Sequence, residues 1–213
     1  MLYGFIRSFL RLILKLYFRW EVYGKDNLPA VGGALLAANH VSYLDPPLMG
    51  CAVDRHVHFM AKKELFSIPG LGWLMRRFGS IPVERKGSDR QAIRRALELL
   101  QSGSVVGIFP EGTRGDGKTL LKPQPGTVLL AAKAGVPIVP MAITGIERVL
   151  PPGCWLPRPA KIKIFIGEPI EIPVNGTRSS RDVLNGYSQL VMERIDELRS
   201  CQKAAAGRAV LRM

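Results

Sequence analysis

Short apolar runs alternate with amphipathic stretches along most of this chain. The apolar runs predict buried strands at residues 34–38, 57–61, 80–83, 105–109, 137–143 and 162–166. Apolar residues at helical spacing predict helices at 89–101, 126–134 and 181–199. Strands that alternate with helices over 213 residues indicate one α/β domain. We expect a mostly parallel or mixed central sheet flanked by helices.

Local signals set the expected boundaries of these elements. Ser88 is the predicted N-cap of the helix at 89–101, and Gly135 ends the helix at 126–134. The proline-rich stretch 151–159 is expected to be a surface loop. We expect residues 21–200 to form the domain and 201–213 to be a loosely ordered tail.

Residues 1–20 predict an amphipathic helix. Arg7, Arg11, Lys15 and Arg19 recur every four residues, and apolar side chains cover most of the remaining surface. Four cations are costly in a membrane-spanning helix, which needs about 20 mainly apolar residues. The segment also lacks the unbroken apolar centre and cleavage site of a signal peptide. The pattern favours a helix in the membrane interface with its cations at lipid headgroups, although a helix packed on its own domain is an alternative.

The composition narrows the classes of partner. A formal net charge of +13 predicts an anionic partner: nucleic acid, anionic lipid or a phosphorylated substrate. Beyond the N-terminal helix, aromatic and basic residues are not interleaved in a nucleic-acid-binding motif, so no nucleic-acid partner is expected. The three cysteines, Cys51, Cys154 and Cys201, show neither metal-ligand spacing nor a disulfide pattern. No metal site is expected, and a reducing compartment is the expected setting.

His40 and Asp45 form the strongest candidate for chemistry. A histidine oriented by a carboxylate is a good general base near neutral pH. Residues five apart lie on different faces of a regular helix or strand, so the pair can meet only if the chain turns between them. Asp45 precedes Pro46, which favours such a turn. Two structural alternatives remain open: Asp45 caps a helix, or Ser42 and Asp45 form a capping box.

Further polar residues follow the other predicted strands. Phe109-Pro110-Glu111-Gly112-Thr113-Arg114 begins where the strand at 105–109 ends. Arg114 can grip a phosphate with its planar guanidinium, and Gly112 permits a close backbone approach. Arg85 and Lys62 follow the strands at 80–83 and 57–61. Ligands of α/β sheets collect beyond the carboxyl ends of strands, so the recurrence of polar groups at these ends indicates one site.

Four ordered motifs, spread over about residues 20–170, resemble those of the glycerophospholipid acyltransferase family, which includes 1-acyl-sn-glycerol-3-phosphate acyltransferases. They are His40-x4-Asp45, Gly79-x5-Arg85, the segment 109–114 and Val136-Pro137-Ile138-Val139-Pro140. The first and third motifs are highly specific together. Pro82 departs from the family, in which many members have phenylalanine at this position.

The resemblance implies that His40 takes the proton from a glycerol hydroxyl as this oxygen attacks an acyl thioester. Asp45 would orient the imidazole, and no enzyme nucleophile is needed. Arg114, Arg85 and Lys62, with the turn at Glu111, Gly112 and Thr113, would hold the phosphate of the acceptor. We expect Glu111 to order this loop or a basic neighbour, and backbone amides near His40 are the candidates for stabilising the oxyanion.

The resemblance also implies substrates and a location. The expected acceptor is lysophosphatidic acid, with glycerol 3-phosphate or another lysophospholipid as alternatives. The expected co-substrate is acyl-CoA or acyl-acyl carrier protein, and no other cofactor is expected. A serine hydrolase is disfavoured because the chain has no Gly-x-Ser-x-Gly elbow. The expected location is the cytoplasmic face of a membrane, in peripheral or monotopic attachment.

Overall fold

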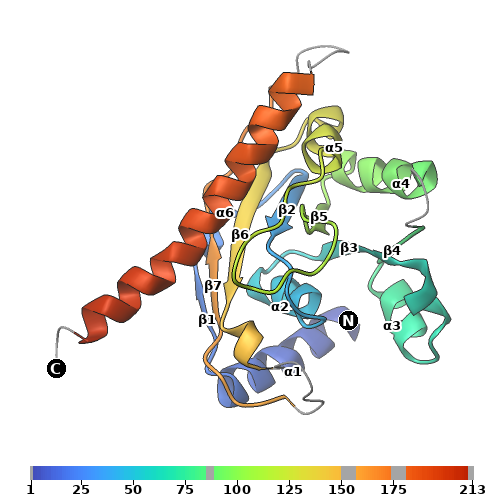
Figure 1. Cartoon of the computed structure of the whole chain (residues 1–213). Helices are drawn as coiled ribbons and strands as arrows, with labels where there is room; N and C mark the ends of the chain where they lie inside the picture. The colour runs from blue at the N-terminus through green and yellow to red at the C-terminus, as the bar shows by residue number, and fades with distance from the viewer. Residues whose placement is uncertain (1, 85–88, 150–156, 174–180, 211–213) are drawn as a thin grey trace.

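One mixed sheet organises the part of the chain that the computed structural model describes, residues 2–84, 89–149, 157–173 and 181–210. Its strands are β1 (Glu21–Tyr23), β2 (Ala34–Ala38), β3 (Val57–Lys62), β4 (Ile81–Val83), β5 (Val105–Ile108), β6 (Ile138–Thr144) and β7 (Lys163–Ile166). They lie in the order β1-β7-β6-β2-β5-β3-β4 (Figure 1). Only the β6–β7 pair is antiparallel among these neighbours. The predicted mixed α/β sheet is confirmed.

Helices cover both faces of this sheet. They are α1 (Leu2–Tyr17), α2 (Asp45–Ala52), α3 (Leu71–Arg77), α4 (Arg90–Gln101), α5 (Gly126–Ala134) and α6 (Arg181–Val210). Leu36 and Ala38 of β2 face a core shared with α2 and the inner side of α1. Leu35 and Ala37, on the alternate face of the same strand, face a core shared with α4, α5 and α6. All five residues of β2 are buried, as expected for a central strand covered on both faces.

The parallel strands bring distant loops to one edge. Strands β2, β5, β3 and β4 run in the same direction and are adjacent in that order. Their carboxyl ends therefore open on a single side of the sheet, which we call the carboxyl edge. The loops after these strands carry the candidate site residues.

Some predicted boundaries were wrong. Asp89, not Ser88, caps α4, because its side chain accepts a hydrogen bond from the Ala92 amide at 2.9 Å. Helix α6 continues to Val210, past the predicted end at residue 199. The loose order predicted for residues 201–213 stays a prediction. Short elements without a strong pattern, β1 and α3, were not predicted, whereas α5 and its C-cap Gly135 match the prediction.

The face that α1 exposes to solvent differs from the predicted one. Arg11 donates from Nε to the Cys51 carbonyl at 2.8 Å and from its terminal nitrogen to Val53 O at 2.7 Å and Asp54 Oδ1 at 2.8 Å. Arg7 donates to the Asp54 carbonyl at 2.5 Å. These two cations bind the end of α2, so the prediction that they lie at lipid headgroups is wrong. The outward face of α1 is apolar instead, with Phe5, Phe9, Leu12 and Leu16 each more than half exposed.

Candidate active site

His40 and Asp45 meet at the carboxyl edge, immediately after β2. His40 Nδ1 lies 2.8 Å from Asp45 Oδ2. The Asp45 side chain is fully buried, whereas the His40 side chain is 14 % exposed. Since a carboxylate only accepts, Nδ1 carries the shared hydrogen and Nε2 is left to accept a proton. The pair has the geometry of an oriented general base.

The turn between the two residues explains how they meet. Asp45 is the first residue of α2, and its Oδ2 also accepts hydrogen bonds from the amides of Val41 and Ser42, both at 2.7 Å. The Ser42 hydroxyl accepts from the Leu44 amide at 3.2 Å. Asp45 therefore closes the loop that precedes the helix, and neither a simple N-cap at Asp45 nor a complete capping box describes the turn.

These bonds affect the proposed oxyanion donors. The amides of Val41 and Ser42 are used by Asp45, and the His40 amide donates to Glu111 Oε1 at 2.9 Å. The expectation that amides beside His40 stabilise an oxyanion is therefore wrong for these three groups in this conformation. They hold the base in place instead.

The Glu111 carboxylate connects two loops through hydrogen bonds to their backbone amides. It is 3 % exposed, and its second oxygen accepts from the Leu121 amide at 2.9 Å. The Gly115 amide in turn donates to the His40 carbonyl at 2.8 Å. The bonds at His40 join the loops after β2 and β5, and the bond to Leu121 lies within the loop after β5. Glu111 therefore orders these loops, and both of its carboxylate oxygens already accept from backbone amides.

The ring of His40 is fixed by packing as well as by bonding. It stacks on Phe109, with centroids 4.0 Å apart and planes 18° apart. Stacking on one face and the carboxylate at Nδ1 restrict the imidazole to one orientation. The motif contained Phe109, but the sequence did not indicate that it would support the base.

Arg114 lies against the same loop. Its guanidinium stands 3.6 Å from the centre of the Tyr43 ring and donates to the Tyr43 hydroxyl at 2.9 Å. Both residues are exposed. A guanidinium has five N–H donors, so this bond leaves Arg114 able to hold an anion beside the His40 loop. Sequence reasoning missed Tyr43, although it lies inside the first motif.

The other predicted phosphate ligands are placed less closely. Gly112 adopts a φ of 68°, and its amide donates to the Phe109 carbonyl at 3.0 Å, so it shapes the turn. Thr113 is exposed in this turn, and Lys62 is exposed at the end of β3, which is next to β5. Arg85 lies outside the described residues. Within the described ranges, neither Lys62 nor Thr113 makes a hydrogen bond or an ion pair with His40.

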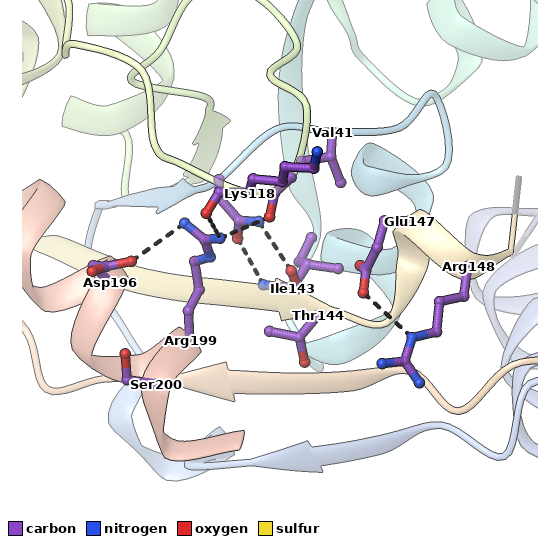
Figure 2. Close-up of a pocket in the computed structure, with 11 residues that line it drawn as sticks. Val41, Lys118, Ile143, Thr144, Glu147, Arg148, Asp196, Arg199 and Ser200 are labelled. Carbon is purple, nitrogen blue, oxygen red and sulfur yellow. Dashed lines mark hydrogen bonds and ion pairs between the residues drawn. The ribbon is translucent and has the colours of Figure 1, made fainter. Parts of the chain in front are cut away.

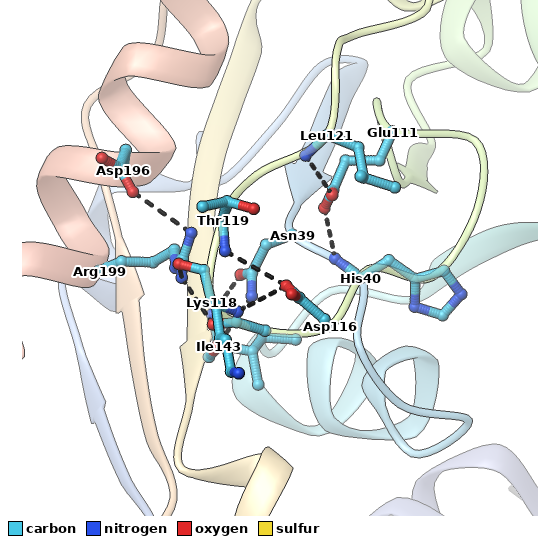
Figure 3. A network of polar contacts seen from close by, with 11 residues as sticks. Asn39, His40, Glu111, Asp116, Lys118, Thr119, Leu121, Ile143, Asp196 and Arg199 are labelled. Atoms are coloured by element: carbon cyan, nitrogen blue, oxygen red, sulfur yellow. Dashed lines mark hydrogen bonds and ion pairs between the residues drawn. The ribbon is translucent and has the colours of Figure 1, made fainter.

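A cavity of about 520 Å³ lies next to Asn39 and Val41, the two chain neighbours of His40 (Figure 2). Its lining includes Asn39, Val41, Lys118, Arg148 and Arg199. Asn39 makes two hydrogen bonds with the backbone of Ile143, at 2.9 and 2.8 Å, which tie the end of β2 to β6. Figure 3 shows that the His40 imidazole points away from this cavity. The cavity therefore adjoins the backbone of the loop, not the base.

Arg199 connects α6 to this region. It donates to the carbonyls of Gly117 and Lys118 at 2.9 and 3.2 Å, and Asp116 accepts from the amides of Lys118 and Thr119 (Figure 3). The loop that follows the Glu111 segment is thus fixed from two sides.

A cysteine nucleophile is not indicated near the base. Cys51 lies in α2, and burial raises the pKa of its thiol to about 11. It is therefore a protonated thiol at neutral pH, which is a poor nucleophile. The described residues also contain no group of three or more His, Cys, Asp or Glu arranged to hold a metal ion.

Comparison with known proteins agrees with this arrangement. The sequence profile of the family described as Acyltransferase matches residues 19–144. The chain is 33 % identical over 198 residues to the 1-acyl-sn-glycerol-3-phosphate acyltransferase of Bacillus subtilis, with 92 % of this chain and 96 % of that protein covered. It is 30 % identical over 158 residues to the chloroplastic 1-acyl-sn-glycerol-3-phosphate acyltransferase BAT2 of Brassica napus, with 72 % and 46 % covered.

A solved structure shows the same fold. The crystal structure of the 1-acyl-sn-glycerophosphate (LPA) acyltransferase PlsC from Thermotoga maritima superimposes with a TM-score of 0.75 at 32 % sequence identity, covering 93 % of this chain and 80 % of that one. The profile match, the curated relatives and the shared fold establish that this chain is an O-acyltransferase and belongs to the acyltransferase family.

Proposed function

We propose that this enzyme transfers a fatty acyl group from an acyl thioester to the free hydroxyl of 1-acyl-sn-glycerol 3-phosphate, which gives phosphatidic acid. The observation that carries the proposal is the His40–Asp45 pair, with its 2.8 Å hydrogen bond and a fully buried carboxylate. The names of the relatives from Bacillus subtilis and Brassica napus support this acceptor.

The pair supplies the proton transfers of this reaction. As the acceptor oxygen attacks the thioester carbonyl, its proton moves to Nε2 of His40, and Asp45 balances the charge of the imidazolium. Collapse of the tetrahedral intermediate breaks the C–S bond, and the imidazolium returns the proton to the leaving thiolate. An ester and a thiol result, and His40 is again neutral.

Positive charge would hold the acceptor's phosphate. Arg114 is the principal candidate because it is exposed and fixed against Tyr43 in the His40 loop. Lys62 is the last residue of β3, and Arg85 comes two residues after the end of β4 in the sequence. These two residues are the further candidates. The thioester donor is acyl-CoA or acyl-acyl carrier protein.

The enzyme would work as a peripheral or monotopic protein on an anionic membrane surface, at its cytoplasmic face. In the described part of the chain no helix has the length and apolar character needed to cross a bilayer. Helix α1 offers an outward apolar face instead, while its inner cations are bound to α2. This face matches the way an interfacial helix sits in a lipid surface.

An acceptor panel tests the reaction. Purified enzyme is incubated with each acyl donor and with detergent-dispersed lysophosphatidic acid, glycerol 3-phosphate or lysophosphatidylcholine, and the products are identified by mass spectrometry. We expect phosphatidic acid, and we expect His40→Ala to slow its formation by about 10²–10⁴-fold. His58→Ala, the same substitution in β3, serves as the control. Full activity of the His40→Ala enzyme would rule out His40 as the general base. Acyl transfer only to an acceptor other than lysophosphatidic acid would rule out the proposed substrate.

A further inference from the structure

We propose that the hairpin formed by η2 (Lys63–Ser67) and α3 is a second membrane-contacting element, which holds the carboxyl edge against an anionic bilayer together with α1. The proposal rests on the proposed membrane attachment of α1 and adds to it a contact site on a different element. We call residues 63–77 the α3 hairpin.

The α3 hairpin displays large apolar side chains to solvent. Ile68 is 47 % exposed, Leu71 is 40 % exposed and Trp73 is 58 % exposed. They lie within six residues of one another, at the turn and in the first turn of α3. Clustered exposed apolar residues mark interaction surfaces, and tryptophan, like tyrosine, is enriched at the membrane–water boundary.

The backbone fixes this display. The amide of Gly72 donates to the Ile68 carbonyl at 2.8 Å, and a Cβ added at Gly72 would lie 2.1 Å from the Phe66 carbonyl oxygen. Phe66 is buried, and Arg76 donates to its carbonyl at 3.1 Å. The two short helices are therefore packed in contact at Gly72, which keeps Trp73 on the outside.

The charge around the apolar cluster fits an anionic surface. Lys62, Lys63, Arg76 and Arg77 are all exposed in or next to the α3 hairpin, and Lys63 is paired with Glu84. Basic side chains beside an apolar cluster suit anionic headgroups, because their stems lie along the apolar boundary while their charges meet phosphate.

The α3 hairpin begins at the edge of the sheet that carries the site, and the residue after it contacts α1. It begins directly after Lys62, at the carboxyl edge. The ring of Tyr3 in α1 meets Phe78, the residue after α3, with centroids 5.2 Å apart in an edge-to-face contact. Figure 1 shows α1 and α3 at the lower side of the molecule and α5 at the opposite side. A single interfacial helix leaves the domain free to rotate about it, and a second contact would restrict this rotation.

Bromolipid quenching tests the contact directly. The chain's other tryptophans are replaced by Trp20→Phe and Trp155→Phe, so that the full-length protein reports through Trp73 alone. Vesicles of phosphatidylcholine and phosphatidylglycerol are prepared with and without brominated acyl chains. We expect bromolipid to quench Trp73 and phosphatidylcholine alone to bind the protein less.

Matched variants test the energetic contribution. In the otherwise native chain, Trp73→Ala and Leu71→Ser should each weaken co-sedimentation with these vesicles by about fivefold, as expected for partial apolar burial. Leu129→Ser is the control, because Leu129 is 39 % exposed, close to the 40 % of Leu71. It belongs to α5, a helix at the opposite side of the molecule from α3 (Figure 1). This control should bind as the native chain does.

The outcomes separate the two proposals. Binding without quenching of Trp73, or binding that Leu71→Ser leaves unchanged, would overturn the α3 hairpin contact and leave α1 as the anchor. No binding by the native chain would overturn the membrane attachment as a whole, while transfer to detergent-dispersed substrate would still report on the chemistry. A dimer in lipid-free solution that Leu71→Ser dissociates would show that a second copy, not a bilayer, covers the cluster.

Discussion

Helix α2 is eight residues long, and charged side chains meet each of its ends. At its N-terminus, the Asp45 carboxylate binds His40 and two loop amides. At its C-terminus, Arg11 donates to the Cys51 carbonyl in the last turn and to the Val53 carbonyl at the C-cap. Arg7 donates to the Asp54 carbonyl just past the helix. A negative group at the start of a helix and positive groups at its end both complement the helix dipole.

The two ends nevertheless do different work. The N-terminal carboxylate is buried and orients a partly exposed imidazole, so its electrostatics serve the proposed chemistry. The C-terminal guanidiniums join α1 to the domain, and thereby turn the apolar face of α1 outward. The comparison predicts that changes at the N-terminus of α2 lower kcat. It also predicts that changes at the C-terminus of α2 weaken the attachment of α1 to the domain.

The largest expected effect is that of Asp45→Asn. The amide cannot balance the charge of an imidazolium, so we expect kcat to fall by about 10²–10⁴-fold. Steady-state kinetics with detergent-dispersed lysophosphatidic acid measure this, and circular dichroism checks the fold. A kcat close to that of the native enzyme would show that Asp45 serves only the loop.

Glu111→Gln is expected to act through the loop that holds the base. Glutamine has one oxygen where Glu111 uses two, so one of the amides of His40 and Leu121 loses its acceptor. We expect the free energy of unfolding to fall by about 1–3 kcal/mol and Tm to fall by about 2–12 °C. Thermal denaturation measures the shift, with the exposed Glu168→Gln as control. An unchanged Tm would contradict the claim that the two hydrogen bonds of Glu111 stabilise these loops.

Arg11→Met breaks the other end of α2. It removes the bonds to Cys51, Val53 and Asp54 while keeping an apolar side chain. The free energy that holds α1 against the end of α2 should therefore fall by about 1–3 kcal/mol. Limited proteolysis should cut near α1 faster, whereas kcat on detergent-dispersed substrate stays close to native. Lys15→Met removes the same charge at an exposed position of α1 and is the control. If kcat fell without faster cleavage near α1, the C-terminal end of α2 would affect catalysis and not the packing of α1, and the proposed division between the two ends would be wrong.

The smallest effect is expected from the pH dependence of the Arg11–Asp54 pair. The Arg11 guanidinium holds the pKa of Asp54 below its usual value near 3.8. A folded pKa below the unfolded one contributes stability above the unfolded pKa, and this stability is lost as the pH falls further. Asp54 is 75 % exposed, so solvent weakens the pair.

Melting curves at a series of pH values test this pair. Below about pH 5, the Tm of the native chain should fall slightly more steeply with falling pH than the Tm of Asp54→Asn, because the contribution of the pair is lost as the pH falls from the unfolded pKa through the folded pKa. Parallel curves would show that the pair contributes nothing measurable.

The agreement between sequence and structure differs from element to element. The boundaries of β2 and α5 follow from a continuous apolar run and from a small-residue helix ended by Gly135. Local patterns also predicted that polar groups follow β2, β3 and β5. The three-residue strand β1 and the short helix α3 have too few residues for a period to show, so only their pairing and packing define them.

Within the site, the sequence by itself determined that a histidine and an aspartate flank a turn at the end of a strand, because strand, turn and proline signals are local. The tertiary structure decided what each side chain meets. Glu111 binds the His40 amide across 71 positions, Arg114 reaches Tyr43 across the same separation, and Arg11 turns to α2 across 40. Periodicity shows that a helix has two faces, but only packing against α2 selects which face of α1 is covered. The physical reason is that such contacts depend on chain reversal through the sheet, which no short window of sequence contains.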